Sequence, residues 1–296
     1  MMLVGMDTQF LQNDSLVNAK FRDYISTSHE RSYITVMEGI GNLNPLYFEA
    51  NLAPYYLIRL KEEYKWAVEL SPQILIRMRR ESSFPIRTPS YMPRITYYHN
   101  LYENTGIRKQ IIPFVSIIHH SNGQNGDFYL QDGTINRHSG NFSTNYLEAG
   151  AFRTQLNPGR HGQRRFYKAF LEYHFANDPH LSGQYGVFRV NFEFQLIQKL
   201  RASVGNHPTE RKFQENHRLR QSVKLGWTFG EVAEAGQTLL EDRLKFEYTI
   251  SYHPKMTEDM SLFIQYYYGK DYYNIYFDRN ISVLRFGLMT DQLKLW

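Results

Sequence analysis

Apolar and polar residues alternate along much of this chain with a period of two, the pattern expected of β-strands whose two faces meet different surroundings. In the clearest stretch, residues 244–252, apolar side chains occupy the even positions and polar or charged side chains the odd ones. Further stretches of this kind, bounded by Gly, Pro, Asn or Asp, lie at 74–78, 94–98, 112–121, 145–155, 166–174, 188–196, 223–229, 262–268 and 281–288. The pattern predicts an all-β protein of antiparallel strands.

The alternation is strong on both faces of these strands. One face carries aromatic and large aliphatic residues, and the other carries Arg, Lys, Glu, Gln and Asn. A soluble sandwich buries such an apolar face, whereas a transmembrane barrel turns it toward lipid and keeps the charged face inside. Phe286-Gly287-Leu288 and the terminal Trp296 are similar to the closing strand of bacterial outer-membrane barrels. We therefore predict an antiparallel transmembrane β-barrel of about 12 strands.

The start of the chain lacks this regular alternation. We expect a polar N-terminal lead-in over residues 1–42, followed by a single barrel domain over residues 43–296. Residues 1–10 contain no basic stretch followed by an apolar one, so no secretory signal is visible.

Composition narrows the class of protein. Hydrophobic residues make up 42% of the chain and the mean hydropathy is −0.53, and no run approaches the roughly 18 apolar residues of a spanning helix. Aromatic residues make up 16%, which suits strands and interfacial girdles. Cysteine is absent, which excludes disulfides and thiol chemistry. The net charge is +5, but Lys and Arg are scattered, so nucleic-acid binding is not expected.

The stretch at 112–121 ends in a polar pair on an otherwise apolar face. His119 and Ser121 share this face with Val115 and Ile117, because alternate residues of a strand point the same way. Residues two apart on a strand have Cβ atoms roughly 6 to 7 Å apart, within reach of an imidazole-to-hydroxyl hydrogen bond. A base and a nucleophile at the end of an apolar stripe suit a lipid substrate. Taken alone, such a pair is usually incidental, and Ser-Asn-Gly is also an ordinary turn sequence.

Several separated stretches resemble the outer-membrane phospholipase A family. Residues 119–123 match its His-x-Ser-Asn-Gly motif, and residues 143–145 match its Ser-x-Asn motif. Residues 81–87 and 91–93, and residues 265–274 near the end of the chain, are similar to two further motifs of the family. The matches follow one another in the family's order over about residues 45–296.

The resemblance implies a bacterial outer-membrane phospholipase with A1, A2 and lysophospholipase activity, acting through a Ser-His-Asn triad. Ser121 would attack the acyl carbonyl, and His119 would take its proton and return it to the leaving lyso-lipid. Asn145 would hold the imidazole in the productive tautomer. Backbone N–H groups around Ser121 and Gly123 would stabilise the oxyanion.

Asn145 can lie beside His119 and Ser121 only if the connection between the two strands places its side chain on the face that they share. A connection centred on Gly133, with a three-residue turn at Asp132-Gly133-Thr134, places Asn145 opposite Ser121 and on that face. A two-residue Asp132-Gly133 turn would place Asn145 on the other face.

The resemblance also implies a calcium ion beside the triad and a calcium-dependent homodimer. Its ligands would be the carbonyl of Gln124, the side chain of Asn141 and, from the partner subunit, Ser82 or Ser83. The family has Arg and Ser where this chain has Gln124 and Asn141, but a carbonyl and an amide oxygen both suit calcium. The expected partners are phospholipid, the outer membrane and a second copy of the chain.

Three alternatives stay open: a catalytically silent barrel of the same lineage, a passive porin and a soluble β-sandwich. Equal release of fatty acid by the wild type and by Ser121→Ala would indicate a silent barrel. A porin requires a wide lumen, whereas bulky inward residues such as Arg189 and Glu193 favour a filled one. A soluble sandwich would stay monodisperse without detergent.

Overall fold

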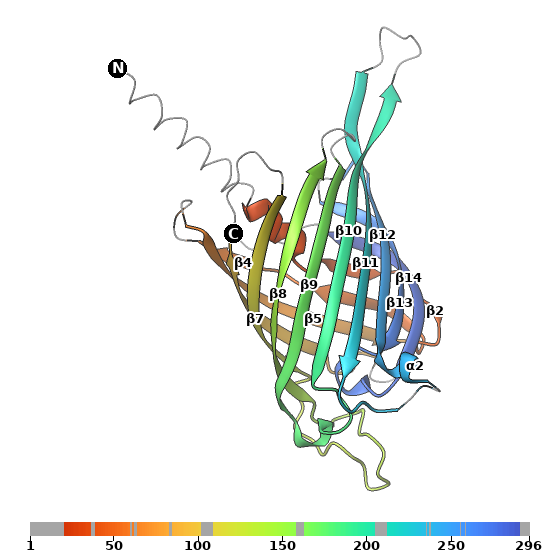
Figure 1. Ribbon diagram of the computed structural model, residues 1–296. Coiled ribbons are helices and arrows are strands. Elements are labelled where there is room, and N and C mark those ends of the chain that lie inside the picture. The colour runs from red at the N-terminus through yellow and green to blue at the C-terminus, as the bar shows by residue number, and fades with distance from the viewer. Residues whose placement is uncertain are drawn as a thin grey trace.

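The computed structural model describes residues 21–290, apart from internal segments at 37–38, 60, 62–63, 83–84, 102–108, 158–162, 205–211, 235, 237, 255 and 258. These residues form a closed antiparallel β-barrel (Figure 1). Its strands are β1 (Ser32–Thr35), β2 (Ile40–Gly41), β3 (Leu46–Leu52), β4 (Tyr56–Ile58), β5 (Trp66–Arg79), β6 (Ser90–His99), β7 (Lys109–Ser121), β8 (Ser143–Asn157), β9 (Gln163–Asn177), β10 (Phe188–Val204), β11 (Lys212–Phe229), β12 (Leu244–His253), β13 (Met260–Lys270) and β14 (Asn280–Thr290).

The helices are short: residues 21–28, η2 (Pro179–Leu181), α2 (Leu239–Arg243) and η3 (Asn274–Tyr276). Within the described ranges, none of them has the length and apolar character needed to cross a membrane.

The wall has 12 strand positions, because the first two positions each consist of two short pieces. β1 and β2 both pair with β14, and β3 and β4 both pair with β5. β1 also pairs with β3, which closes the barrel. The predicted barrel of about 12 strands is therefore confirmed, and every stretch predicted from alternation lies within β5 to β14.

The N-terminal segment departs from the predicted lead-in over residues 1–42. β1 and β2 lie inside this segment and complete the wall. Residues 21–28 are helical, and Phe21 and Ile25 are buried against inward-facing side chains of β5 to β9. Strands this short carry too little alternation to be recognised in the sequence. The boundary after residue 42 is thus not an edge of the barrel, while residues 1–20 and Trp296 lie outside the described residues.

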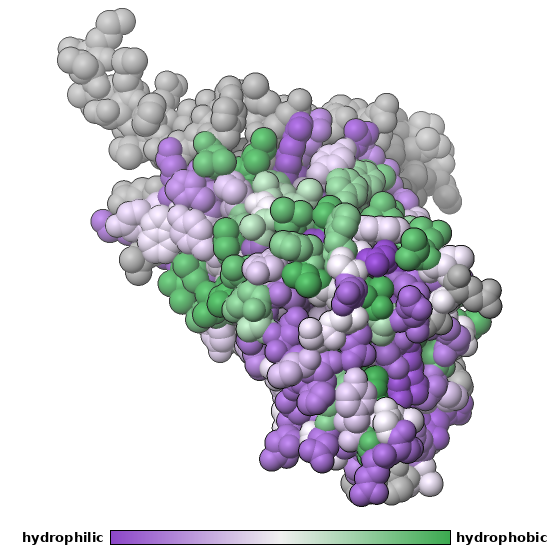
Figure 2. Space-filling model, turned by 60° about the horizontal axis from the view of Figure 1, so that its bottom comes forward, coloured by the Kyte–Doolittle hydropathy of each residue, from purple (hydrophilic) through white to green (hydrophobic). Residues whose placement is uncertain are grey.

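The two faces of the wall differ in chemistry. The outer face is apolar, as at Ile117 and Phe192, which are 49% and 41% exposed. Figure 2 shows hydrophobic residues on the wall and hydrophilic residues over the loop end that faces the viewer. The inner face is polar, and Glu49, Glu69 and Arg77 are buried there. An apolar exterior around a charged interior is the arrangement of a membrane barrel and the reverse of a soluble sandwich.

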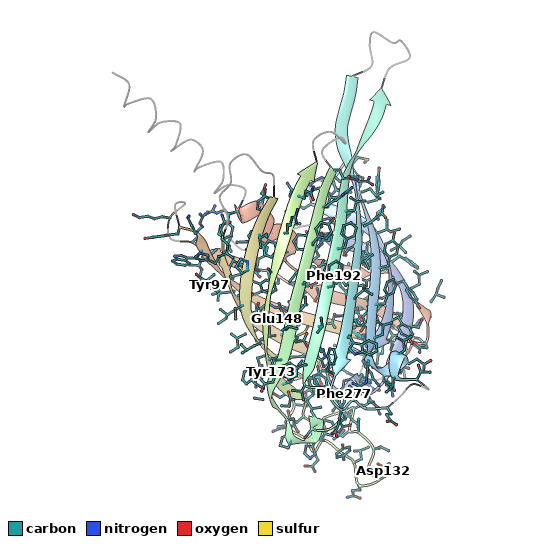
Figure 3. The ribbon with its side chains drawn as sticks, viewed as in Figure 1. Tyr97, Asp132, Glu148, Tyr173, Phe192 and Phe277 are labelled. Atoms are coloured by element: carbon teal, nitrogen blue, oxygen red, sulfur yellow. The ribbon has the colours of Figure 1, made fainter. Side chains whose placement is uncertain are left out.

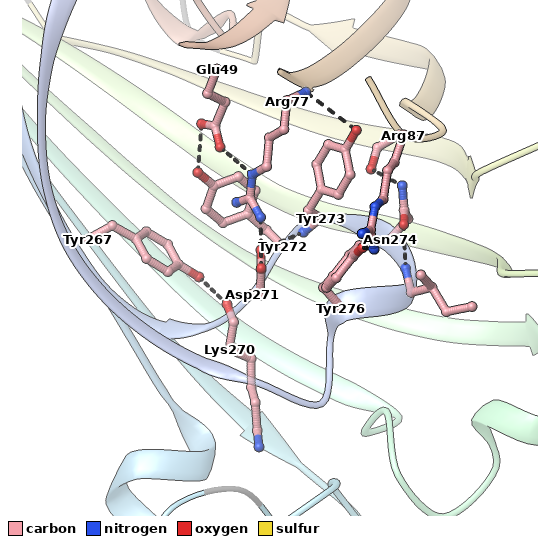
Figure 4. Close-up of polar contacts among 12 residues, drawn as sticks. Glu49, Arg77, Arg87, Tyr267, Lys270, Asp271, Tyr272, Tyr273, Asn274 and Tyr276 are labelled. Carbon is pink, nitrogen blue, oxygen red and sulfur yellow. Dashed lines mark hydrogen bonds and ion pairs between the residues drawn. The ribbon is translucent and has the colours of Figure 1, made fainter. Parts of the chain in front are cut away.

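Charged side chains fill the lumen. Arg77 donates hydrogen bonds to Glu49 (2.6 Å) and Asp271 (2.7 Å), and the hydroxyl of Tyr272 donates to Glu49 (2.7 Å) (Figure 4). Arg285 forms a further ion pair with Glu49. A cavity of about 320 Å³ remains inside. This filled interior is unlike the open channel of a porin.

Long connections gather at the lower end of Figure 1, where β5–β6, β7–β8, β9–β10, β11–β12 and β13–β14 turn. An apolar cluster that includes Phe128, Phe142, Tyr273 and Phe277 packs beneath them. Long connections mark the extracellular end of outer-membrane barrels. The candidate site lies at this end, where β7, β8 and β9 meet their connections.

Candidate active site

The pairing of β7 with β8 decides which side chains meet. His119 lies opposite Asn145, and Ser121 lies opposite Ser143. The prediction that Asn145 lies opposite Ser121 is therefore wrong by two residues, although Asn145 does share the face of His119 and Ser121.

The difference in pairing comes from the turn. Asp132 accepts hydrogen bonds from the backbone N–H (2.9 Å) and the hydroxyl (2.6 Å) of Thr134, which tightens the connection around Asp132 and lowers the pKa of its carboxyl. Leu130 donates its N–H to the carbonyl of Thr134, and Tyr129 bridges to Ile135. The connection is thus centred on Asp132 rather than Gly133, and Asp132 lies at its tip (Figure 3).

A hydrogen bond joins His119 to Asn145 on the outer wall. His119 Nδ1 lies 2.8 Å from Asn145 Oδ1. Asn145 Nδ2 donates over 3.5 Å to the carbonyl of Ala176 on β9. Because a carbonyl oxygen can only accept, the amide nitrogen of Asn145 faces Ala176 and its oxygen faces His119. Nδ1 therefore carries the imidazole proton, and Nε2 is the basic nitrogen.

An irregularity in β9 brings Ala176 to this position. Asn145 pairs with Ala176, but the next residue, Tyr146, pairs with His174, so Phe175 is an extra residue. Such a bulge re-aims the backbone of its strand. Alternation in the sequence gave no signal of it.

Asn122 shapes the chain just after Ser121. This buried residue donates from Nδ2 to the carbonyl of Gly140 (2.9 Å) and accepts at Oδ1 from the N–H groups of Phe142 (3.1 Å) and Gln124 (3.2 Å). The N–H of Gly123, which lies between these contacts, has no acceptor among the described residues. Gly123 has φ +67°, a conformation that favours glycine.

Ser121 and Gly123 lie beside an aromatic ring. Tyr91 of β6 pairs with Ser121, and a Cβ atom at Gly123 would lie 3.5 Å from Cε2 of this ring. Within the described part of the chain there is no hydrogen bond between His119 and Ser121. Catalytic hydrogen bonds are often long in unliganded enzymes and tighten when substrate binds.

An apolar row borders the polar pair along the outer wall. Ile117, Leu147, Tyr173 and Phe188 follow one another across β7 to β10, each paired with the next. All four are exposed, and the rings of Tyr173 and Phe188 stack at 4.8 Å. Tyr173 lies on the wall near the loop end (Figure 3). The imidazole of His119 therefore meets a surface suited to acyl chains.

The predicted calcium positions differ in what surrounds them. Asn141 donates from Nδ2 to Asp178 Oδ2 (2.7 Å), which leaves its side-chain oxygen for another partner. Gln124 is half-buried after β7, Ser82 is exposed in the β5–β6 connection, and Ser83 lies outside the described residues. The described ranges contain no group of three or more His, Cys, Asp or Glu side chains that could hold a metal. The amide and carboxylate oxygens of Asn141 and Asp178 nevertheless suit a hard cation.

Asp178 is the residue at this site that sequence reasoning missed. It precedes η2, where its carboxylate accepts from the N–H of His180 (2.9 Å), and its own N–H donates to the carbonyl of Ser143. Asp-Pro before a turn is a helix-start signal, but it does not indicate contact with Asn141 across β8 and β9.

Neither a protein-family model nor a curated protein matches the chain. Among solved structures, outer membrane phospholipase A from Escherichia coli matches with a TM-score of 0.56 and 14% sequence identity, over 89% of this chain and 93% of that one. This chain has the fold of outer membrane phospholipase A.

Two further structures with the phospholipase A fold agree. The Salmonella typhi enzyme, a dimer with bound calcium, has a TM-score of 0.55 and 14% identity, over 89% of this chain and 91% of its own. An active-site mutant of the E. coli protein has a TM-score of 0.53 and 14% identity, over 90% and 91%. The protein is thus a β-barrel of the outer-membrane type.

Proposed function

We propose that this protein is an outer-membrane phospholipase that hydrolyses acyl ester bonds of phospholipids, with Ser121, His119 and Asn145 as its catalytic residues. The observation that carries the proposal is the 2.8 Å contact between His119 Nδ1 and Asn145 Oδ1 on the lipid-facing wall. The apolar row beside this pair and the phospholipase A fold support it.

The chemistry would proceed through an acyl-enzyme. His119 Nε2, which Asn145 leaves unprotonated, removes the proton of Ser121 Oγ as the hydroxyl attacks the ester carbonyl. His119 then gives this proton to the leaving lyso-lipid. Water, deprotonated by the same nitrogen, releases the fatty acid from Ser121. Asn145 fixes the tautomer but, as a neutral amide, stabilises imidazolium less than a carboxylate would.

The free N–H of Gly123 is the donor that we assign to the oxyanion, together with the N–H of Ser121. A preformed donor costs no reorganisation as charge develops on the carbonyl oxygen. The sharp turn that Asn122 holds keeps Gly123 in place.

Calcium and homodimerisation belong to the same proposal. The carbonyl of Gln124 and the side-chain oxygen of Asn141 would hold the ion, with Asp178 beside them and Ser82 or Ser83 supplied by the partner. When bound, calcium would add positive charge near the oxyanion. The calcium-bound dimer of the Salmonella protein supports this part of the proposal.

The test compares two serine variants in detergent micelles that contain phospholipid. Ser121→Ala should lose release of fatty acid, whereas Ser143→Ala, the same change directly opposite on the outer face of β8, should keep it. Phospholipids labelled at sn-1 or at sn-2 distinguish A1 from A2 activity. Equal rates for wild type and Ser121→Ala would refute the assignment and indicate a silent barrel.

The calcium assignment has its own test. Crosslinking in detergent should trap a dimer with calcium but not with a chelator, and Asn141→Ala should weaken this response. Failure to dimerise would remove the calcium assignment and leave the triad in place.

A further inference from the structure

Four arginines surround one tyrosine at the loop end of the barrel. The guanidinium carbons of Arg79, Arg137 and Arg279 lie 4.6, 5.8 and 5.3 Å from the centre of the Tyr276 ring. Arg87 donates a 2.8 Å hydrogen bond to the hydroxyl of Tyr276 (Figure 4). We call these four residues and Tyr276 the arginine cluster.

The arginine cluster forms only through tertiary contacts. Arg79 ends β5 and Arg87 lies in the β5–β6 connection, whereas Arg137 and Arg279 come from the β7–β8 and β13–β14 connections. Tyr276 itself is buried at the end of η3. Like charges repel one another, so their collection around one ring calls for compensating negative charge.

The protein supplies only part of that charge. Glu81 pairs with Arg87 (3.0 Å) and, at 3.9 Å, with Arg79. Asp278 pairs with Arg137. In the described part of the chain no ion pair is formed by Arg279. Two carboxylates therefore face four guanidinium groups.

Hydrogen-bond donors are also left over. The Nε atoms of Arg79 and Arg137 are buried and have no acceptor among the described residues. Arg79 as a whole is 4% exposed, so water provides little compensation. Buried donors without acceptors are costly, and native proteins seldom keep them without a ligand, ion or water.

We propose that the arginine cluster binds a phosphate group. A phosphate monoester carries nearly two negative charges at neutral pH and three acceptor oxygens. Both properties match the charge and the donors that the protein leaves uncompensated. A guanidinium group can bind phosphate through two parallel N–H donors. Because the cluster has more arginines than carboxylates, it attracts an anion and repels a cation.

The position of the cluster defines the sources of this phosphate. Arg87 and Arg137 keep 28% and 23% of their side chains exposed at the end where the long connections gather. The phosphate could belong to the headgroup of a lipid at the outer rim of the membrane or to a free ion in solution. The proposal concerns binding alone and does not depend on the proposed esterase activity.

The experiment measures binding by calorimetry to the full chain in a neutral detergent. One arm uses inorganic phosphate, and the other uses mixed micelles with a dialkyl ether phosphatidic acid, which has no ester for the protein to cleave. Arg279→Gln should weaken binding about tenfold, since it removes one charge-assisted contact. Arg87→Gln should have a similar effect, and Arg279→Lys should be intermediate because it keeps the charge without the planar fork.

The matched control is Arg22→Gln, which removes the same charge from an exposed position on the N-terminal helix. It should bind like the wild type in both arms. Weakening in both arms supports a site for the phosphate group itself, and weakening with the lipid alone identifies a headgroup site. Equal affinity of wild type and Arg279→Gln in both arms, or no binding by the wild type in either, would overturn the proposal.

Discussion

Two chains of hydrogen-bonded side chains, each of which includes a histidine, lie on opposite sides of the barrel wall. On the outside, Asn145 contacts His119. On the inside, Thr144 Oγ1 lies 2.7 Å from His174 Nδ1, and His174 Nε2 lies 2.7 Å from Glu172. The inner chain contains a hydroxyl, an imidazole and a carboxylate, as a hydrolase triad does, yet Thr144 is 0% and His174 4% exposed.

The candidate site therefore differs from the buried inner side chains in its accessibility from outside the barrel, and not in its hydrogen-bond geometry. Thr144 and Asn145 are neighbours on β8, and so are His119 and His120 on β7, but alternation sends each pair to opposite faces. His120 is buried inside, with its ring 5.0 Å from that of Phe142. Only the outer chain meets lipid.

The largest effect that would test this comparison is on catalysis. His119→Ala should lower the rate of ester hydrolysis by about a hundredfold to ten-thousandfold or more, because the general acid–base catalyst is lost. The adjacent change His120→Ala should keep the rate per folded molecule. Fatty-acid release, normalised to folded barrel, measures both, and equal losses would contradict the separation of the two faces.

The next effect concerns the stability of the lumen. Arg77→Gln should lower the free energy of unfolding by about 3–5 kcal/mol, because Glu49 and Asp271 lose a buried partner. Urea unfolding in lipid vesicles measures this change. Arg22→Gln, at an exposed position, should have little effect, and similar losses in the two variants would show that the inner charges are not coupled.

A charge on the outer wall should be tolerated less well than the charges inside. Phe192 is the fifth residue of β10 (Figure 3) and faces outward. Phe192→Arg should lower the free energy of unfolding by about 2–4 kcal/mol in vesicles, because it places a cation in hydrocarbon. Phe192→Leu is the control. If the two variants were equally stable, this face would not contact lipid.

The smallest expected effect distinguishes neighbours on β8. Thr144→Val should cost about 1–3 kcal/mol of stability, since it leaves His174 Nδ1 without its hydrogen-bond partner, and should spare activity. Asn145→Ala should lower the rate of hydrolysis and have little effect on stability. Unfolding curves and hydrolysis rates of the two variants provide the measurement, and a loss of activity in Thr144→Val alone would assign the chemistry to the inner chain.

Much of the wall could be predicted from the sequence. Long strands with one face in lipid and one in a polar lumen repeat a two-residue pattern that local sequence records. For the same reason the shared face of His119 and Ser121 was predictable, whereas the face of Asn145 depended on the length of the turn between β7 and β8. β1 to β4 were missed because short, interrupted strands depend on their neighbours for pairing.

The sequence by itself determined which side chains face out of the barrel and which face in, because successive side chains of a strand point to opposite faces. Tertiary structure decided which of them touch. The turn at Asp132 set the pairing of His119 with Asn145, the bulge at Phe175 supplied the carbonyl that orients the amide, and separate connections brought Asp178 to Asn141. The arginine cluster likewise joins residues from three connections, a closeness that no local pattern encodes.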